Sequence, residues 1–186
     1  MAFLTDAYKV AGLVQSGRRA LLKKDFASAL RDLAHAAEED PGYIVTGAHF
    51  REGVLTYLGR AQYAVGRMAQ AKQSFERALA AFSEDLLTRL YLWMSLVRGG
   101  DELRGVIELQ KGLQALRDWI EDILRARPFE DFWDPNGQIR GEIQRVLDLI
   151  ARKRFDREQH LGSIEWIGDA MEEETDRVQR DERRQC

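Results

Sequence analysis

The chain has 186 residues, of which 45% are hydrophobic and 32% charged, and its formal net charge is −3. This composition is typical of a folded domain, and the 28 Lys and Arg residues against 31 Asp and Glu residues argue against a protein that binds nucleic acid. The single cysteine, Cys186, excludes an intramolecular disulfide and therefore a disulfide-stabilised secreted scaffold. No signal-like segment opens the sequence and no run of about 18 apolar residues occurs, so we expect a cytoplasmic protein without a membrane span.

Apolar residues recur at spacings of three and four residues through most of the chain, which is the period of an amphipathic helix. Short polar or glycine-containing breaks separate the apolar segments, and they fall at 23–25, 40–42, 66–67 and 99–101. Apolar segments divided in this way predict three helical hairpins in succession. The sequence therefore predicts an all-α fold.

Small residues repeat in register along these hairpins. Gly17, Ala29 and Ala36 recur 42 residues later as Gly59, Ala71 and Ala78. In the third hairpin, Gly105 and Gly112 stand at the positions of the two alanines. Small side chains let helices approach closely, so each hairpin can bury a face against its neighbour.

With these residues the chain resembles the tetratricopeptide repeat (TPR) family, whose unit is a helical hairpin of about 34 residues. The resemblance covers about residues 6–119, with units near 10–43 and 52–85 and a degenerate unit near 86–119. The unit at 52–85 matches best, through Leu58, Gly59, Ala71, Phe75 and Ala78, while Tyr63 lies one place beyond the usual tyrosine. In the third unit Trp93 replaces the small residue of the first helix, so this unit is either a divergent repeat or a capping hairpin.

The first two units are separated by eight residues more than one repeat length, around residues 42–49. The simplest interpretation is that the first helix of the second unit begins two turns early, and a loop is the alternative. Both arrangements would leave Tyr43, Ile44 and Phe50 protruding from the regular stack, where they could pack on an added helix or on a partner.

A different pattern begins where Pro128 is expected to end the last repeat helix. An aromatic loop at 128–137 follows, in which Asp134 and Pro135 predict the N-cap and first position of a further helix. Phe129, Phe132 and Trp133 of this loop either pack on the protein's own core or form a docking patch or a lid over a groove.

Helical spacing resumes over 139–153 and again from 161 to 178. Trp166 on the last helix is predicted to be a core residue, and the acidic run at 172–174 is predicted to be a solvated face. We therefore predict a short TPR-like helical-hairpin solenoid at 1–127 with additional C-terminal capping helices and a charged tail at 138–186.

The TPR resemblance implies that positions 5, 9 and 12 of each repeat line a concave peptide-binding groove. These positions are Val14, Arg18, Leu21, Thr56, Arg60, Tyr63, Leu90, Met94 and Val97, with Arg98 as a further candidate. Arg18 and Arg60 share one repeat position on neighbouring helices, and guanidinium groups grip carboxylates well. We therefore expect a protein ligand, namely an acidic and partly apolar peptide or helix. The alternative is that these arginines pair with acidic neighbours such as Glu52 or face water.

Catalytic and metal-binding patterns are missing from the sequence. The three histidines, His35, His49 and His160, are far apart, and no nucleotide-binding, phosphate-binding or nucleophile motif occurs. We expect no catalytic residues, no cofactor and no metal, and hence no enzyme. The predicted function is a non-enzymatic scaffold, adaptor or chaperone-like protein. The alternative is a self-assembling subunit of a larger complex that forms homo-oligomers through its repeat ends or its C-terminal helices.

Overall fold

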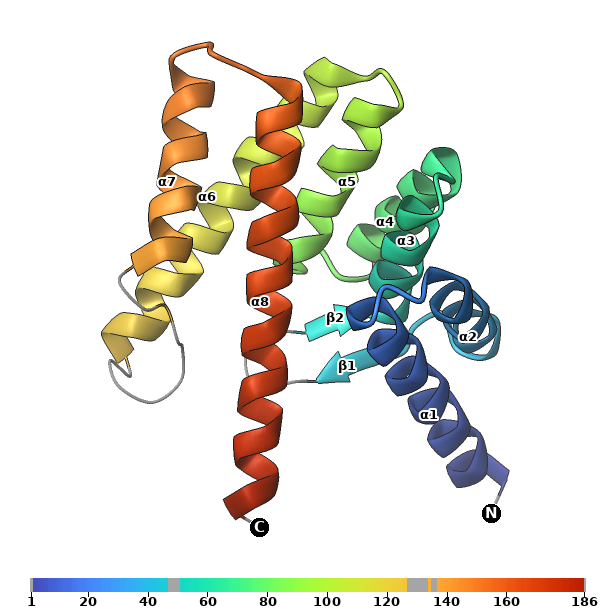
Figure 1. Cartoon of the computed structure of the whole chain (residues 1–186). Coiled ribbons are helices and arrows are strands. Elements are labelled where there is room, and N and C mark those ends of the chain that lie inside the picture. Colours follow the sequence, from blue (N-terminus) through green and yellow to red (C-terminus); the bar gives the residue numbers. More distant parts are fainter. Residues whose placement is uncertain (1, 47–50, 127–133, 135–136, 186) are drawn as a thin grey trace.

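Three helical hairpins follow one another and are covered by two further helices (Figure 1). The structure, a computed structural model, describes residues 2–46, 51–126, 134 and 137–185. The hairpins are α1 (Ala2–Leu22) with α2 (Phe26–Glu39), α3 (Val54–Ala64) with α4 (Met68–Ala81), and α5 (Leu86–Arg98) with α6 (Glu102–Ala126). The remaining helices are α7 (Gln138–Ala151) and α8 (Arg157–Gln185). The fold is thus an all-α, TPR-like helical-hairpin solenoid with additional C-terminal helices, as the sequence predicts.

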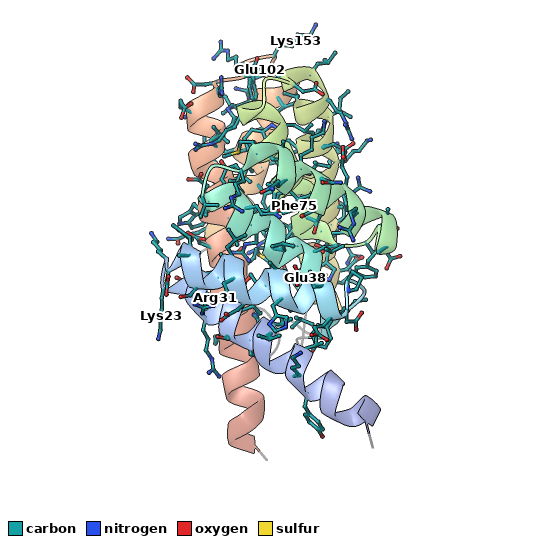
Figure 2. All side chains as sticks on the ribbon, turned by 90° about the vertical axis from the view of Figure 1, so that its right-hand side faces the viewer. Lys23, Arg31, Glu38, Phe75, Glu102 and Lys153 are labelled. Atoms are coloured by element: carbon teal, nitrogen blue, oxygen red, sulfur yellow. The ribbon has the colours of Figure 1, made fainter. Side chains whose placement is uncertain are left out.

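Successive hairpins stack so that their first helices are neighbours. Helix α2 packs on α3 and α4 packs on α5, while α1 contacts α3 and α3 contacts α5. One face of the solenoid is therefore built from α1, α3 and α5, and the second helices lie behind it. Lys23, Arg31 and Glu38 project outward from the first hairpin (Figure 2).

In each of the first two hairpins, a glycine on the first helix lets the second helix pack closely against it. A Cβ atom at Gly17 would lie 2.4 Å from Cγ of Leu33, and one at Gly59 would lie 2.5 Å from Cε1 of Phe75. Both distances are far below van der Waals contact, so only glycine lets each pair of helices approach this closely. The repeated small residues of the sequence have this physical cause.

In the third hairpin the large and small residues exchange helices. Trp93, at the position of Gly17 and Gly59, is fully buried on α5. A Cβ atom at Gly105 of α6 would lie 3.1 Å from the Trp93 ring and 2.8 Å from Val97. Glycine on the second helix therefore makes room for tryptophan on the first.

The insertion between the first two hairpins is a small antiparallel sheet. Strand β1 (Ile44–Thr46) pairs with β2 (Arg51–Gly53), and Val45 lies opposite Glu52. The prediction of an early start for the next helix is wrong, because α3 begins only at Val54. The β-branched run Ile-Val-Thr favours an extended backbone over a helical one. Tyr43 is half-buried and Ile44 is exposed, while Phe50 lies outside the described residues.

Four helices end in the same kind of turn, in which one residue takes the left-handed backbone conformation. These residues are Lys24, Gly66, Gly100 and Lys153, with φ angles of 59°, 80°, 92° and 55°. The following amide closes each turn, as when Asp25 N donates to Ala20 O at 2.9 Å. Lysine stands at two positions where glycine would be free of backbone strain.

Helix α7 begins later than predicted. Its first residue is Gln138 and its N-cap is Gly137, which has a φ of 65°, so Asp134 is not the N-cap by position. Asp134 still caps the helix from a distance, because its carboxylate accepts from the Ile139 amide at 2.8 Å and from the Arg140 amide at 3.3 Å. The capping role of Asp134 was therefore predictable from the sequence, whereas the first residue of α7 was not.

Candidate functional site

The predicted groove residues lie on α1, α3 and α5, but they do not share one face. Arg18, Arg60, Tyr63 and Arg98 contact α8. Leu90 and Val97 instead pack toward Gly112 and Gly105 of α6, and Thr56 bonds Asp85 and Thr88. The buried members are Val14, Arg18, Thr56, Leu90, Met94 and Val97, the half-buried ones are Leu21, Arg60 and Tyr63, and Arg98 is exposed. Helix α8, red in Figure 1, runs beside α5 and contacts it. Side chains of α1, α3 and α5 bind or contact α8, and we call this set the α8-binding face: Arg18, Arg60, Tyr63, Tyr91 and Arg98.

A buried carboxylate of α8 joins the first two repeats. Oε1 of Glu172 accepts from Nη2 of Arg18 at 2.8 Å, and Oε2 accepts from Nη1 of Arg60 at 2.6 Å. The side chains of Arg18 and Glu172 are only 2% and 3% exposed. Two arginines at one repeat position therefore hold the two oxygens of a single glutamate.

Aromatic rings surround this ion pair. The Arg18 guanidinium lies 5.2 Å from the centroid of the Tyr57 ring. The Arg60 guanidinium lies 5.8 Å from the Tyr57 centroid and 4.7 Å from that of Tyr91. Such cation–π contacts fix the guanidinium planes and lower the cost of burying their charge.

The buried pair stays ionised. Burial alone would raise the pKa of Glu172, but the charges of Arg60 and Arg18 and their hydrogen bonds hold this pKa below its usual value. Burial likewise acts to lower the pKa of Arg60, yet nearby groups including Tyr91 and Glu172 raise it above the ordinary value. Removing one partner would leave an uncompensated charge in the interior, which is expensive.

Glu52 of β2 lies in the same cluster but in a different protonation state. Burial raises its pKa to about 8, and the negative charges of Glu172 and Asp85 contribute to this rise. At neutral pH its carboxyl group is therefore mostly protonated. Its Oε1 atom is buried and has no hydrogen-bond partner among the described residues. Glu172, and not the Glu52 suggested by the sequence, is thus the carboxylate that pairs with Arg18 and Arg60.

A second contact lies near the edge of the face. Oε1 of Glu165 is 3.5 Å from Nη2 of Arg98 and 3.5 Å from the Tyr63 hydroxyl. The Arg98 guanidinium lies over the Tyr63 ring at 5.3 Å from its centroid. Both side chains of the Glu165–Arg98 pair are half exposed, so solvent screens this interaction far more than the buried one.

Apolar residues and one glycine bring α8 close to the solenoid. Ile164, Ile167 and Met171 are fully buried in the main core. A Cβ atom at Gly168 would lie 2.6 Å from the Tyr91 hydroxyl, so any larger residue would push the helix away. These positions and Glu172 recur every three or four residues, which places them on one side of α8.

Two predictions about α8 are wrong for the same geometric reason. Trp166 was expected in the core but is 42% exposed, and Glu172 and Glu174 were expected in solvent but are each 3% exposed. The face of α8 that meets the solenoid passes through residues 164, 168, 171 and 172, so Trp166 and Glu173 point elsewhere. The acidic residues next to Met171 are the signal that could have identified this face.

The aromatic docking patch predicted from the sequence stays a prediction. Phe129, Phe132 and Trp133 lie outside the described residues, as does His49. Within the part of the chain that the structure describes, no group of three or more His, Cys, Asp or Glu side chains could hold a metal ion. None of the described helices combines the length and apolar character needed to cross a membrane.

Comparisons with known proteins support the fold. No protein-family model and no curated protein matches the sequence. Among solved structures, the chain is similar to a Thermobaculum terrenum O-GlcNAc transferase mutant, K341M, with a TM-score of 0.54 and 19% sequence identity. The similarity covers 81% of this chain and 27% of the transferase chain. At this identity the likeness shows a shared fold, which is compatible with a TPR-like helical repeat.

Proposed function

We propose that this protein is a non-enzymatic binding scaffold whose concave face takes up an acidic, partly apolar helix of a protein partner. The observation that carries the proposal is the pair of hydrogen bonds that Arg18 and Arg60 donate to the carboxylate of Glu172. In the free chain, α8 occupies the face that would receive the partner. The proposal includes a cytoplasmic location and needs no cofactor.

The composition of the face supports a helix as the ligand. Guanidinium groups stack on tyrosine rings along it and bind the carboxylates of Glu165 and Glu172. Tyr91 also belongs to the same hydrophobic core cluster as Ile167 and Met171 of α8. Arginine and tyrosine are the residue types that dominate binding energy in protein interfaces. A helix laid into a groove through carboxylate and apolar anchors is a recurring mode of recognition.

Exchange of helices is physically feasible because an incoming helix would recover the contacts that α8 gives up. The free-energy difference then depends on how the two helices differ, and on the tether that holds α8 close to its face. Such a tether acts as an effective concentration on the order of millimolar. A partner helix must therefore bind the α8-binding face more tightly than tethered α8 does, or bind a chain in which the contacts of α8 with this face are weaker.

A peptide of residues 157–185 is the defined probe, because its sequence is known to fit the face. Labelled with fluorescein, it is titrated by anisotropy into the full chain and into full-length Gly168→Ala and Gly162→Ala variants. A methyl group at position 168 would collide with Tyr91, whereas a Cβ atom at Gly162 meets nothing within 4 Å. We expect the Gly168→Ala chain to bind the peptide at least about tenfold more tightly than the other two.

Circular dichroism establishes that each variant is folded, and a Glu172→Gln chain weakens α8 by loss of charge instead of by a clash. If neither the folded Gly168→Ala chain nor the folded Glu172→Gln chain binds the peptide, the proposal is refuted and the face is a closed internal interface. Light scattering tests the self-assembly alternative. Under that alternative the chain would be an oligomer that the peptide dissociates.

A further inference from the structure

We infer that the partner helix carries glutamates seven residues apart, with glycine three residues after the first and apolar residues between them. The inference rests on the proposed function and names the class of partner. The template is the stretch of α8 from Ile164 to Glu172, whose contacts with the solenoid define what each position must be.

The last position of this pattern must be a carboxylate long enough to reach two arginines. Nη2 of Arg18 and Nη1 of Arg60 approach different oxygens of Glu172, so both oxygens are used. An amide in this place would offer one acceptor oxygen and would leave the second arginine facing an NH₂ group. The α8-binding face should therefore discriminate strongly between glutamate and glutamine here.

The middle position must be glycine. The atom that excludes a side chain is the hydroxyl of Tyr91, which would lie 2.6 Å from a Cβ atom at Gly168. Tyr91 is itself held in place, with its ring 6.0 Å from that of Phe75 and 4.7 Å from the Arg60 guanidinium. Tyr91 thus contacts the Arg60 guanidinium and also limits the size of the residue at position 168. The requirement for a carboxylate at position 172 and the requirement for glycine at position 168 therefore depend on the same tyrosine.

The first glutamate and the apolar positions set the direction and the register of the helix. Seven residues are close to two helical turns, so Glu165 and Glu172 lie on the same side of α8. Their partners come from different repeats, since Arg98 belongs to α5 while Arg18 and Arg60 belong to α1 and α3. A helix laid in the opposite direction would place glycine away from Tyr91. Ile167 and Met171 supply the buried apolar surface between the two contacts.

Charge complementarity favours an acidic partner over a neutral one. The face presents Arg18, Arg60 and Arg98 in a row across three successive first helices. Glutamates at the two ends of the motif would place a negative charge opposite each end of this row. The buried end should contribute most of the affinity, because the Glu165–Arg98 contact is half exposed.

The test uses the full-length Gly168→Ala chain and a panel of α8 peptides that differ by one residue. Glu172→Gln and Gly168→Ala each have a matched control in the same peptide. Glu172→Gln is paired with Glu173→Gln, which removes the same charge at an exposed position. Gly168→Ala is paired with Gly162→Ala, which adds the same methyl group where a Cβ atom meets nothing within 4 Å.

We expect the Glu172→Gln and Gly168→Ala peptides each to bind at least about tenfold more weakly than the parent, and both controls to stay within about threefold of it. Glu165→Gln should weaken binding by about twofold to fivefold. Equal losses within either matched pair would overturn the inference while leaving the proposed function intact, because the parent peptide would still bind. If the parent peptide binds neither weakened chain, the proposed function fails and this inference falls with it.

Discussion

Arg60 of α3 and Glu172 of α8 lie 112 residues apart in the sequence and form a buried ion pair with an N–O distance of 2.6 Å. Arg18 binds the other oxygen of the same carboxylate at 2.8 Å. One glutamate thereby fastens the C-terminal helix across the first two repeats. The face formed by Arg18 and Arg60 on α1 and α3 is thus occupied by a helix of the same chain.

Loss of this carboxylate should destabilise the protein strongly. Replacing Glu172 with Gln leaves two buried arginines without their anionic partner, and we expect the free energy of unfolding to fall by about 3–5 kcal/mol. The measurement is urea unfolding followed by circular dichroism. Glu173→Gln is the control, because this neighbour is exposed, and its effect should stay within about 0.5 kcal/mol. Similar losses for the two variants would show that Glu172 is not a structural anchor.

The two glycines of α8 should respond oppositely to alanine. Gly168→Ala forces a methyl group against the Tyr91 hydroxyl and should cost about 1–3 kcal/mol of stability. Gly162→Ala meets no atom within 4 Å and should instead stabilise the helix by about 0.5–1 kcal/mol. Thermal unfolding of the two variants beside the parent chain compares these effects. A stabilising Gly168→Ala substitution would contradict the close approach of α8 to α5.

Glu52 should make stability depend on pH. Its pKa is raised from 4.5 to about 8, so the folded state binds more protons than the unfolded state between these values. Stability from this group therefore decreases as pH rises through that window. Glu52→Gln removes the titrating group. As pH rises from about 5 to about 8.5, the free energy of unfolding of the variant should increase relative to that of the parent chain by roughly a few kcal/mol. Urea unfolding at several pH values measures this gain, and a constant difference between the two chains would refute the assignment.

The repeat pattern was predictable because the small residues required by helix packing recur at a fixed spacing in the sequence. Gly17 and Gly59 each lie against one large side chain of the next helix, so their spacing reports the packing itself. The resemblance to TPR repeats implies a face built from the first helices. Of the residues predicted for it, Arg18, Arg60, Tyr63 and Arg98 contact α8, whereas Leu90 and Val97 pack toward α6. Helical period and turn residues also placed most helix ends.

The occupant of that face could not be read from the sequence in the same way. Glu172 stands in a run of three glutamates, of which Glu172 and Glu174 are buried and Glu173 is exposed. Its place beside Met171 indicates the apolar side of α8, but nothing local identifies the arginines that it meets. Its partners are 112 and 154 residues away, so the pairing depends on how α7 folds α8 back onto the solenoid. The strands at 44–46 and 51–53 were missed because they are short and lie within an insertion that the repeat does not explain.

Glycine at the repeat position of α3 should be indispensable. Gly59→Ala would place a methyl group 2.5 Å from the buried Phe75 ring and should destabilise the chain by about 1–3 kcal/mol. Gly12, on α1, has no atom within 4 Å of its Cβ position, so Gly12→Ala serves as the control and should be neutral or stabilising. Chemical unfolding of both variants provides the measurement. Equal stabilities would argue against the packing role of the repeated glycines.

The claim that the α8-binding face exchanges its own helix for that of a partner is tested most directly by amide hydrogen exchange. The full-length Gly168→Ala chain is labelled with ¹⁵N, and NMR spectra follow its amides with and without saturating unlabelled peptide 157–185, so only the chain is observed. We predict that amides of α8 from Glu165 onward exchange faster in the presence of the peptide, while those of α6 remain unchanged. A peptide that binds and leaves α8 equally protected would bind elsewhere on the surface, and that result would contradict the account.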